Sequence, residues 1–157
     1  MAAISRAGEG GFTYVATLAA LAIFGIGLAA LGQSWSALAR RDKEDELLRV
    51  GGAYAQAIRS YYLRSPGARR QFPRQLEDLL EDKRFAGTER HLRRLYRDPV
   101  TRGQAWGLVL AADGGIMGVY SLSEAPALRR QPLRLRYGTV VAGQRYVDWK
   151  FTYTPES

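Results

Sequence analysis

A charge-free run of twenty residues, from Phe12 to Leu31, constrains this chain more than any other feature. Its only polar side-chain groups are those of Thr13, Tyr14 and Thr17. At about 1.5 Å of rise per residue, such a run forms a helix about 30 Å long, which matches the hydrocarbon core of a bilayer. A helix also satisfies its own backbone polar groups, so it can lie in lipid. The run therefore predicts a transmembrane helix, with a buried core helix as the alternative.

The residues before this run differ from an ordinary secretory signal, which places its small-residue cleavage site after the apolar segment. Here Gly11 precedes the run, so a cut at Gly11 would leave the helix in the mature protein. Gly11-Phe12-Thr13 followed by an apolar helix resembles the class III signal of type IV prepilins and type II secretion pseudopilins. The resemblance implies that prepilin peptidase cuts between Gly11 and Phe12 and methylates the new amine of Phe12.

The chain departs from this family at the fifth mature position, where the family usually has Glu and this chain has Ala16. In the family, that carboxylate pairs with the N-terminal amine of a neighbouring subunit. A carboxylate in lipid is costly unless it is paired, so it imposes register between subunits. The resemblance therefore supports processing more strongly than polymerisation as a major subunit, and we expect a low-copy accessory or initiating role.

Small residues recur in the apolar run at a spacing of four. Ala16 with Ala20, and Gly25 with Ala29, form small-xxx-small pairs that would let neighbouring helices approach closely during assembly. The alternative is that small residues are merely tolerated in lipid. The chain is also basic, with a formal net charge of +8. The arginine-rich segments 90–102 and 129–145 allow a second hypothesis, a DNA-binding minor pilin of a competence machine, although solvated surface is the simpler interpretation.

Several kinds of chemistry find little support in the composition. The chain has no cysteine and a single histidine, His91, which disfavours disulfides, thiol chemistry and a zinc site. We expect His91 at the surface or its boundary. The acidic residues after position 113 are scattered along the chain, and they are Glu124, Asp148 and Glu156. This scatter predicts no calcium site. No nucleophile elbow or phosphate-binding loop is present in the sequence, so we expect no enzyme, no cofactor and no small-molecule substrate.

Residues 32–64 continue the helix in amphipathic form. Apolar residues recur there at spacings of three and four and predict one buried face: Leu47, Val50, Tyr54, Ile58 and Tyr61. The charged residues 40–46 are expected to be solvated, and Gly51-Gly52 to bend or weaken the helix. Ser65-Pro66-Gly67 is expected to end it.

The remaining residues predict a small α+β domain. Residues 74–82 are expected to form a short helix with Leu76, Leu79 and Leu80 inward and a solvated acidic face, and residues 90–97 another helical turn. Residues 105–111 and 116–122 predict a hairpin, and the alternation in 146–154 predicts a third strand, whereas 124–145 remain unassigned. The expected helix–sheet core residues are Trp106, Tyr120, Trp149 and Phe151.

The Asp98-Pro99 step and the later Trp106-Gly107 pair loosely resemble the major-pseudopilin type of domain. The expected organisation is a leader (1–11), a transmembrane half-helix (12–31), an amphipathic half-helix (32–64) and a globular region (65–157). The resemblance implies a structural subunit in the inner membrane of a Gram-negative bacterium, with its C-terminal domain in the periplasm. Its implied partners are other pseudopilins, inner-membrane secretion components and prepilin peptidase. A plain signal-anchored periplasmic protein is a further alternative.

Overall fold

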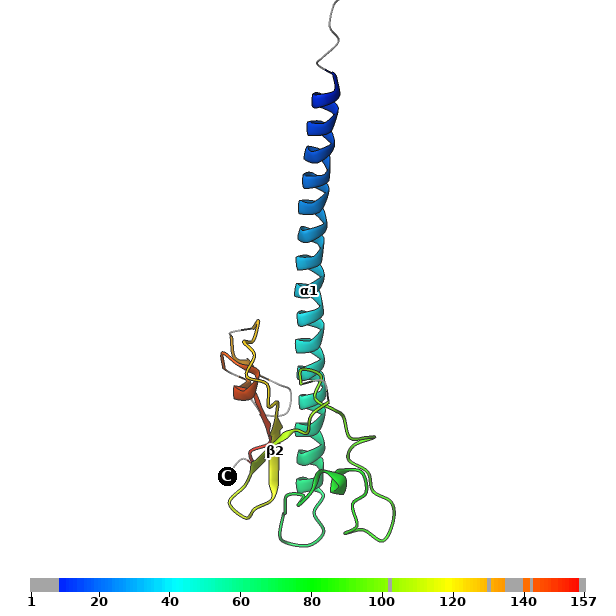
Figure 1. Ribbon diagram of the computed structural model, residues 1–157. Coiled ribbons are helices and arrows are strands. Elements are labelled where there is room, and N and C mark those ends of the chain that lie inside the picture. The colour runs from blue at the N-terminus through cyan, green and yellow to red at the C-terminus, as the bar shows by residue number, and fades with distance from the viewer. Residues whose placement is uncertain (1–8, 102, 130, 135–139, 142, 156–157) are drawn as a thin grey trace, which may run out of the picture. The chain divides into compact units, whose positions relative to one another are not determined.

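The computed structural model describes residues 9–101, 103–129, 131–134, 140, 141 and 143–155, without the side chains of 9–11, 29–37, 134, 140 and 141. The chain divides into two compact units, Met1–Arg40 and Arg41–Ser157. The helix α1 (Glu9–Leu63) contributes residues to both units (Figure 1). It begins before Phe12, the predicted first residue of the mature protein.

The described part of the first unit is the N-terminal portion of α1, which includes Gly11 and the whole apolar run. No helix within the described residues is both long enough and apolar enough to cross a membrane.

The second unit is built around residues 41–63 of α1, whose predicted apolar face is buried. The exposed fraction is 6% or less along the whole predicted stripe: Leu47, Val50, Tyr54, Ile58 and Tyr61. This prediction is confirmed, because side chains three and four residues apart share one face of a helix. The helix ends at Leu63, and Gly67 in the following turn has a positive φ of 83°, which a residue without a side chain adopts most readily.

A three-stranded antiparallel sheet packs beside this part of the helix (Figure 1). Its strands are β1 (Gly107–Leu110), β2 (Ile116–Tyr120) and β5 (Lys150–Thr152), in the order β1-β2-β5. The predicted hairpin and α+β class are confirmed. The third strand, predicted over 146–154, is confirmed only for Lys150–Thr152, because residues 146–148 form a 3-10 helix. The region that the sequence left unassigned contains a second small sheet of β3 (Leu133–Arg134) and β4 (Val140–Val141), followed by the 3-10 helix η2 (Tyr146–Asp148).

Three of the four expected core aromatics are buried: Trp106, Trp149 and Phe151. Tyr120 is only half-buried, so its assignment to the helix–sheet core is wrong. Neighbouring residues of a strand point to opposite faces, and it is Val119, fully buried and paired with Phe151, that faces the helix. The Tyr120 ring instead lies over Gly107, its cross-strand partner.

The segment between helix and sheet is less helical than expected. The predicted helix 74–82 is reduced to the 3-10 helix η1 (Leu76–Leu79), although Leu79 is fully buried as predicted. Residues 90–97 form no helical turn. The N–H groups of His91 and Leu92 donate to the Leu79 carbonyl, at 2.9 and 2.8 Å. This cross-segment pairing replaces the local hydrogen bonds that a helical turn would need.

Gly51 and Gly52 lie within α1, and the helix continues through them without a break. A Cβ atom added at Gly51 would overlap the ring of Phe151, which is fully buried on β5. The absent side chain therefore lets the sheet approach the helix closely.

Replacing Gly51 by alanine should lower the free energy of unfolding by about 1–3 kcal/mol, because overpacking a buried ring outweighs the better helix propensity of alanine. Gln56→Ala, at an exposed position of the same helix, should change it by less than about 0.5 kcal/mol. Urea unfolding of both variants measures the difference. A more stable Gly51→Ala protein would contradict the close packing.

Candidate functional site

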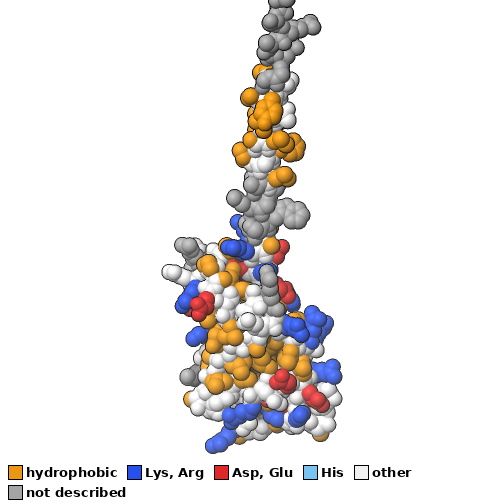
Figure 2. Space-filling model, in the orientation of Figure 1, with side chains coloured by type: hydrophobic (Ala, Val, Ile, Leu, Met, Phe, Trp, Pro, Cys, Tyr) orange, Lys and Arg blue, Asp and Glu red, His pale blue; other side chains and the backbone are white. Residues whose placement is uncertain are grey.

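The apolar part of α1 exposes large hydrophobic side chains on all sides. Phe12, Ile23 and Phe24 are 70–77% exposed, and Figure 2 shows hydrophobic side chains along this part of the helix. Soluble proteins rarely expose so large a contiguous apolar surface, and such surfaces mark membrane or protein contacts. This segment is therefore the first candidate functional element.

The residues predicted for processing and packing all lie on this helix. Ala16 and Ala20 are exposed, and a Cβ at Gly25 would meet nothing within 4 Å, so all three are available to a neighbouring helix. Phe12 is exposed, whereas the side-chain surroundings of Gly11 and Ala29 lie outside the described set.

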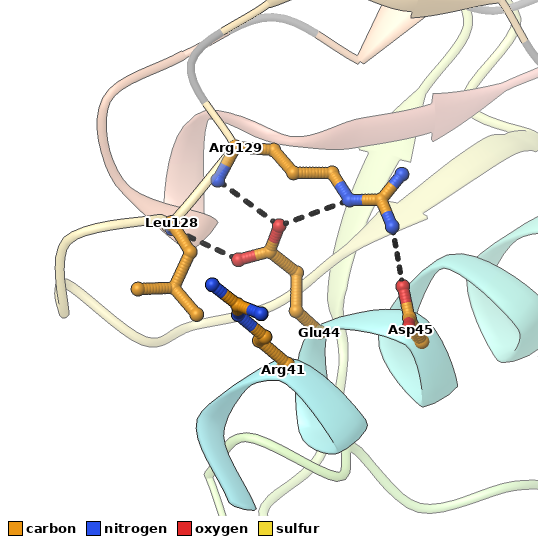
Figure 3. Close-up of a pocket in the computed structure, with 5 residues that line it drawn as sticks. All are labelled: Arg41, Glu44, Asp45, Leu128 and Arg129. Atoms are coloured by element: carbon orange, nitrogen blue, oxygen red, sulfur yellow. Dashed lines mark hydrogen bonds and ion pairs between the residues drawn. The ribbon is translucent and has the colours of Figure 1, made fainter. Parts of the chain in front are cut away.

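A second candidate is a carboxylate cluster around Glu44, near the start of the second unit (Figure 3). Glu44 is 2% exposed and lies in a shallow pocket of about 360 Å³. Its carboxylate accepts hydrogen bonds from the backbone N–H of Leu128 at 2.9 Å and of Arg129 at 3.1 Å. It also accepts a hydrogen bond from the Tyr146 hydroxyl at 3.0 Å. The Arg129 guanidinium lies 3.5 Å from Glu44 and donates to Asp45 at 2.6 Å.

These bonds fasten a loop of the C-terminal half to the helix, since Glu44 and Leu128 are 84 residues apart. The expectation that Glu44 is solvated is therefore wrong. The sequence did carry a signal: Glu44 lies three residues before Leu47 and is in phase with the buried stripe. A charged residue in that phase must find partners, because a buried carboxylate without hydrogen bonds is costly.

A third cluster surrounds His91, which was expected at the surface or its boundary. The residue as a whole is half-buried, but its side chain is fully buried. Its Nε2 lies 3.2 Å from the carboxylate of Asp82, and its Nδ1 lies 2.9 Å from the hydroxyl of Ser60 on α1. Asp82 is 1% exposed, so the expected solvated acidic face is wrong at this position. Arg84 donates to both Asp82 oxygens, at 2.8 and 2.6 Å.

Arg84 links this cluster to the end of α1. It donates to the Tyr61 carbonyl at 2.9 Å and to the Ser65 hydroxyl at 2.7 Å, and its guanidinium lies 3.5 Å from the centre of the Tyr61 ring. Burial raises the pKa of the Asp82 carboxyl, but hydrogen bonds from Arg84 and His91 outweigh burial and leave that pKa below its usual range. The cluster therefore holds an ionised carboxylate in the interior.

Ser60, His91 and Asp82 are the residue types of a hydrolytic triad, and the fold brings them together. Arg84 donates to both carboxylate oxygens of Asp82, and the imidazole of His91 has no exposed surface. The arrangement is suited to joining the segment 82–91 to the helix.

Two arginines of the segment 129–145 have described side chains, Arg129 and Arg145, and both lie near acidic side chains. Arg129 pairs with Glu44 and Asp45, and Arg145 lies 3.8 Å from Asp148. Such pairing reduces the positive charge that could neutralise phosphates. Within the described residues, no group of three or more histidine and acidic side chains is placed to hold a metal ion.

Comparison with known protein families, with curated protein sequences and with solved structures finds no match to this chain.

Proposed function

We propose that this chain is a pseudopilin-like structural subunit of a type II secretion or type IV pilus-like machine. In this proposal, prepilin peptidase removes residues 1–11, and the apolar part of α1 anchors the mature protein in the inner membrane of a Gram-negative bacterium. The second unit then lies in the periplasm. Other pseudopilins and inner-membrane secretion components are its partners, and it performs no catalysis.

One observation carries the proposal: Gly11-Phe12-Thr13 opens an apolar, exposed helix that continues, as the same element, into a buried amphipathic half. An apolar helical surface of this kind is stable in lipid or against other helices, but not in water. The α+β character of the second unit, with its helix beside a three-stranded antiparallel sheet, is consistent with a pilin-like domain.

We further propose an accessory or initiating place in the assembly. Ala16 provides no carboxylate to pair with the amine of the preceding subunit, so register must come from packing of small residues. Expression with the peptidase and assembly ATPase alone, followed by shearing and electron microscopy, tests this place. Abundant filaments made of this chain only would contradict it.

Processing gives the most direct test of the function. Mature protein extracted from membranes of cells with active prepilin peptidase should begin at methylated Phe12, as read by N-terminal mass spectrometry. Gly11→Leu should leave more than about nine-tenths of the chain uncut, because a bulky side chain prevents the close approach of the scissile bond to the catalytic groups.

Gly8→Leu, three residues earlier in the leader, is the matched control and should be processed as the wild type is. A mature start beyond Leu31, or intact Met1 in cells whose peptidase processes another prepilin, would overturn the proposed function.

A further inference from the structure

The second unit carries an open groove of about 510 Å³ at the β1 side of its sheet. Six large apolar or aromatic residues are among those that line it: Tyr54, Leu76, Leu95, Trp106, Leu108 and Ile116. The volume lies within the range of pockets that hold ligands. Figure 2 shows that hydrophobic side chains gather on this unit among basic and acidic ones.

The groove is rigid on the side formed by Tyr54, Tyr96 and Trp106. The indole N–H of Trp106 donates to the Tyr96 carbonyl at 2.8 Å. The Tyr54 hydroxyl donates to the same carbonyl at 3.0 Å and accepts the Tyr96 N–H at 2.9 Å. These three bonds fix two aromatic rings of the groove before any ligand arrives, which lowers the entropic cost of binding.

The rim of the groove is basic. Arg74 and Arg97 line it together with one acidic residue, Glu77, and all three are exposed. Arg74 donates to the carbonyl of Asp113 at 2.7 Å. Neither arginine forms an ion pair with an acidic side chain among the described residues. A ligand carboxylate would therefore find guanidinium groups with hydrogen-bonding capacity to spare.

The groove adjoins a strand at the edge of the sheet. β1 pairs with β2 and has no second neighbouring strand among the described residues. Leu108 is 43% exposed and Leu110 58% exposed, and the two share one face of the strand. An edge strand with exposed apolar side chains offers backbone hydrogen bonds to another extended chain. An extended peptide can use both these bonds and a side-chain pocket.

We propose that this groove and the edge of β1 bind an extended segment of a partner protein in which apolar and acidic residues alternate at every second position, so that both kinds of side chain lie on the face toward the groove. The backbone of the segment pairs with β1. Its apolar side chains enter the groove between Trp106 and Leu108, and its carboxylates meet Arg97 and Arg74 at the rim. The inference uses only the second unit, so it does not depend on the proposed membrane function.

The test uses the full chain in detergent micelles and an acetylated, amidated peptide in which leucine and glutamate alternate at every second position with serine between them, so that both lie on one face of the extended chain. It is called the leucine–glutamate peptide. Trp106 is one of the groove walls, so tryptophan fluorescence follows the titration. The same peptide with lysine in place of glutamate (the leucine–lysine peptide) is the charge control, and the same peptide with serine in place of leucine (the serine–glutamate peptide) is the apolar control. Leu108→Asp and Arg97→Glu alter the groove at exposed positions, and Lys150→Glu alters an exposed position of β5 as the matched control.

The leucine–glutamate peptide should bind saturably. Leu108→Asp and Arg97→Glu should each weaken it by about tenfold or more, whereas Lys150→Glu should change it by less than about twofold. Binding should also weaken as salt is raised. Equal binding of the leucine–lysine or serine–glutamate peptide overturns the proposal. The proposal is also overturned if both groove variants, with circular dichroism spectra like that of the wild type, bind the leucine–glutamate peptide as tightly as the wild type does. Absence of saturable binding of this peptide up to millimolar concentration overturns it as well.

Discussion

Replacing Asp82 by alanine should lower the free energy of unfolding by about 3–5 kcal/mol. The substitution leaves Arg84, only 18% exposed at its side chain, and the enclosed imidazole of His91 without their common acceptor. Removing one partner of a buried ion pair is costly because the other charge stays buried without compensation. Urea unfolding of the full chain in detergent measures the loss. Glu81→Ala, at the exposed neighbouring position, should change the free energy by less than about 0.5 kcal/mol.

The same cluster predicts how stability depends on pH. The pKa of Asp82 is lower in the folded protein than in the unfolded chain, where an aspartate titrates near 3.9. As the pH falls, the unfolded chain therefore binds this proton first, and protonation favours unfolding. The contribution of Asp82 is complete above about pH 5 and is lost as the pH falls below about 4 toward the folded pKa.

Asp82→Asn removes this titration while keeping a side chain of similar size. Between about pH 5 and pH 2, its free energy of unfolding should fall less steeply than that of the wild type. Parallel pH profiles for the two proteins, or equal stability of Asp82→Ala and Glu81→Ala at neutral pH, would show that the cluster does not stabilise the fold.

The parts of the fold that follow from periodicity could be predicted from the sequence. The stripe from Leu47 to Tyr61 and the hairpin of β1 and β2 are set by residues close together in the chain. Their apolar spacing alone distinguishes helix from strand. The helix predicted at 74–82 is shorter in the structure because the Leu79 carbonyl accepts hydrogen bonds from the N–H groups of His91 and Leu92 in another segment.

The polar clusters could not be predicted, because their partners lie far apart in the sequence. His91 meets Ser60 across 31 residues, and Glu44 meets Tyr146 across 102. Nothing in a single sequence indicates which acidic residue in a charged stretch such as 40–46 will be buried, apart from its phase with an apolar stripe. Likewise, Gly51 had the pattern of a helix breaker, and only the approach of Phe151 gives its reason.

Replacing Glu44 by alanine should lower the free energy of unfolding by about 2–4 kcal/mol. It removes the acceptor for the Leu128 and Arg129 N–H groups, and backbone donors left without partners cost about 1–3 kcal/mol each. It also removes one hydrogen-bond partner of the buried Tyr146 hydroxyl. The total stays below their sum because the pocket beside Glu44 admits water. Glu44→Gln, which keeps one acceptor oxygen, should lose less.

The position of the loss should identify the role of Glu44. If its carboxylate fastens the loop to the helix, hydrogen exchange at the amides of Leu128 and Arg129 should accelerate in Glu44→Ala more than exchange in β2 does. Asp45→Ala is the matched control, because Asp45 is exposed and pairs with the half-exposed Arg129 side chain, a type of contact worth at most about 1 kcal/mol. If Glu44→Ala and Asp45→Ala have equal effects on both stability and exchange, the hydrogen bonds from the backbone to Glu44 do not hold the loop on the helix.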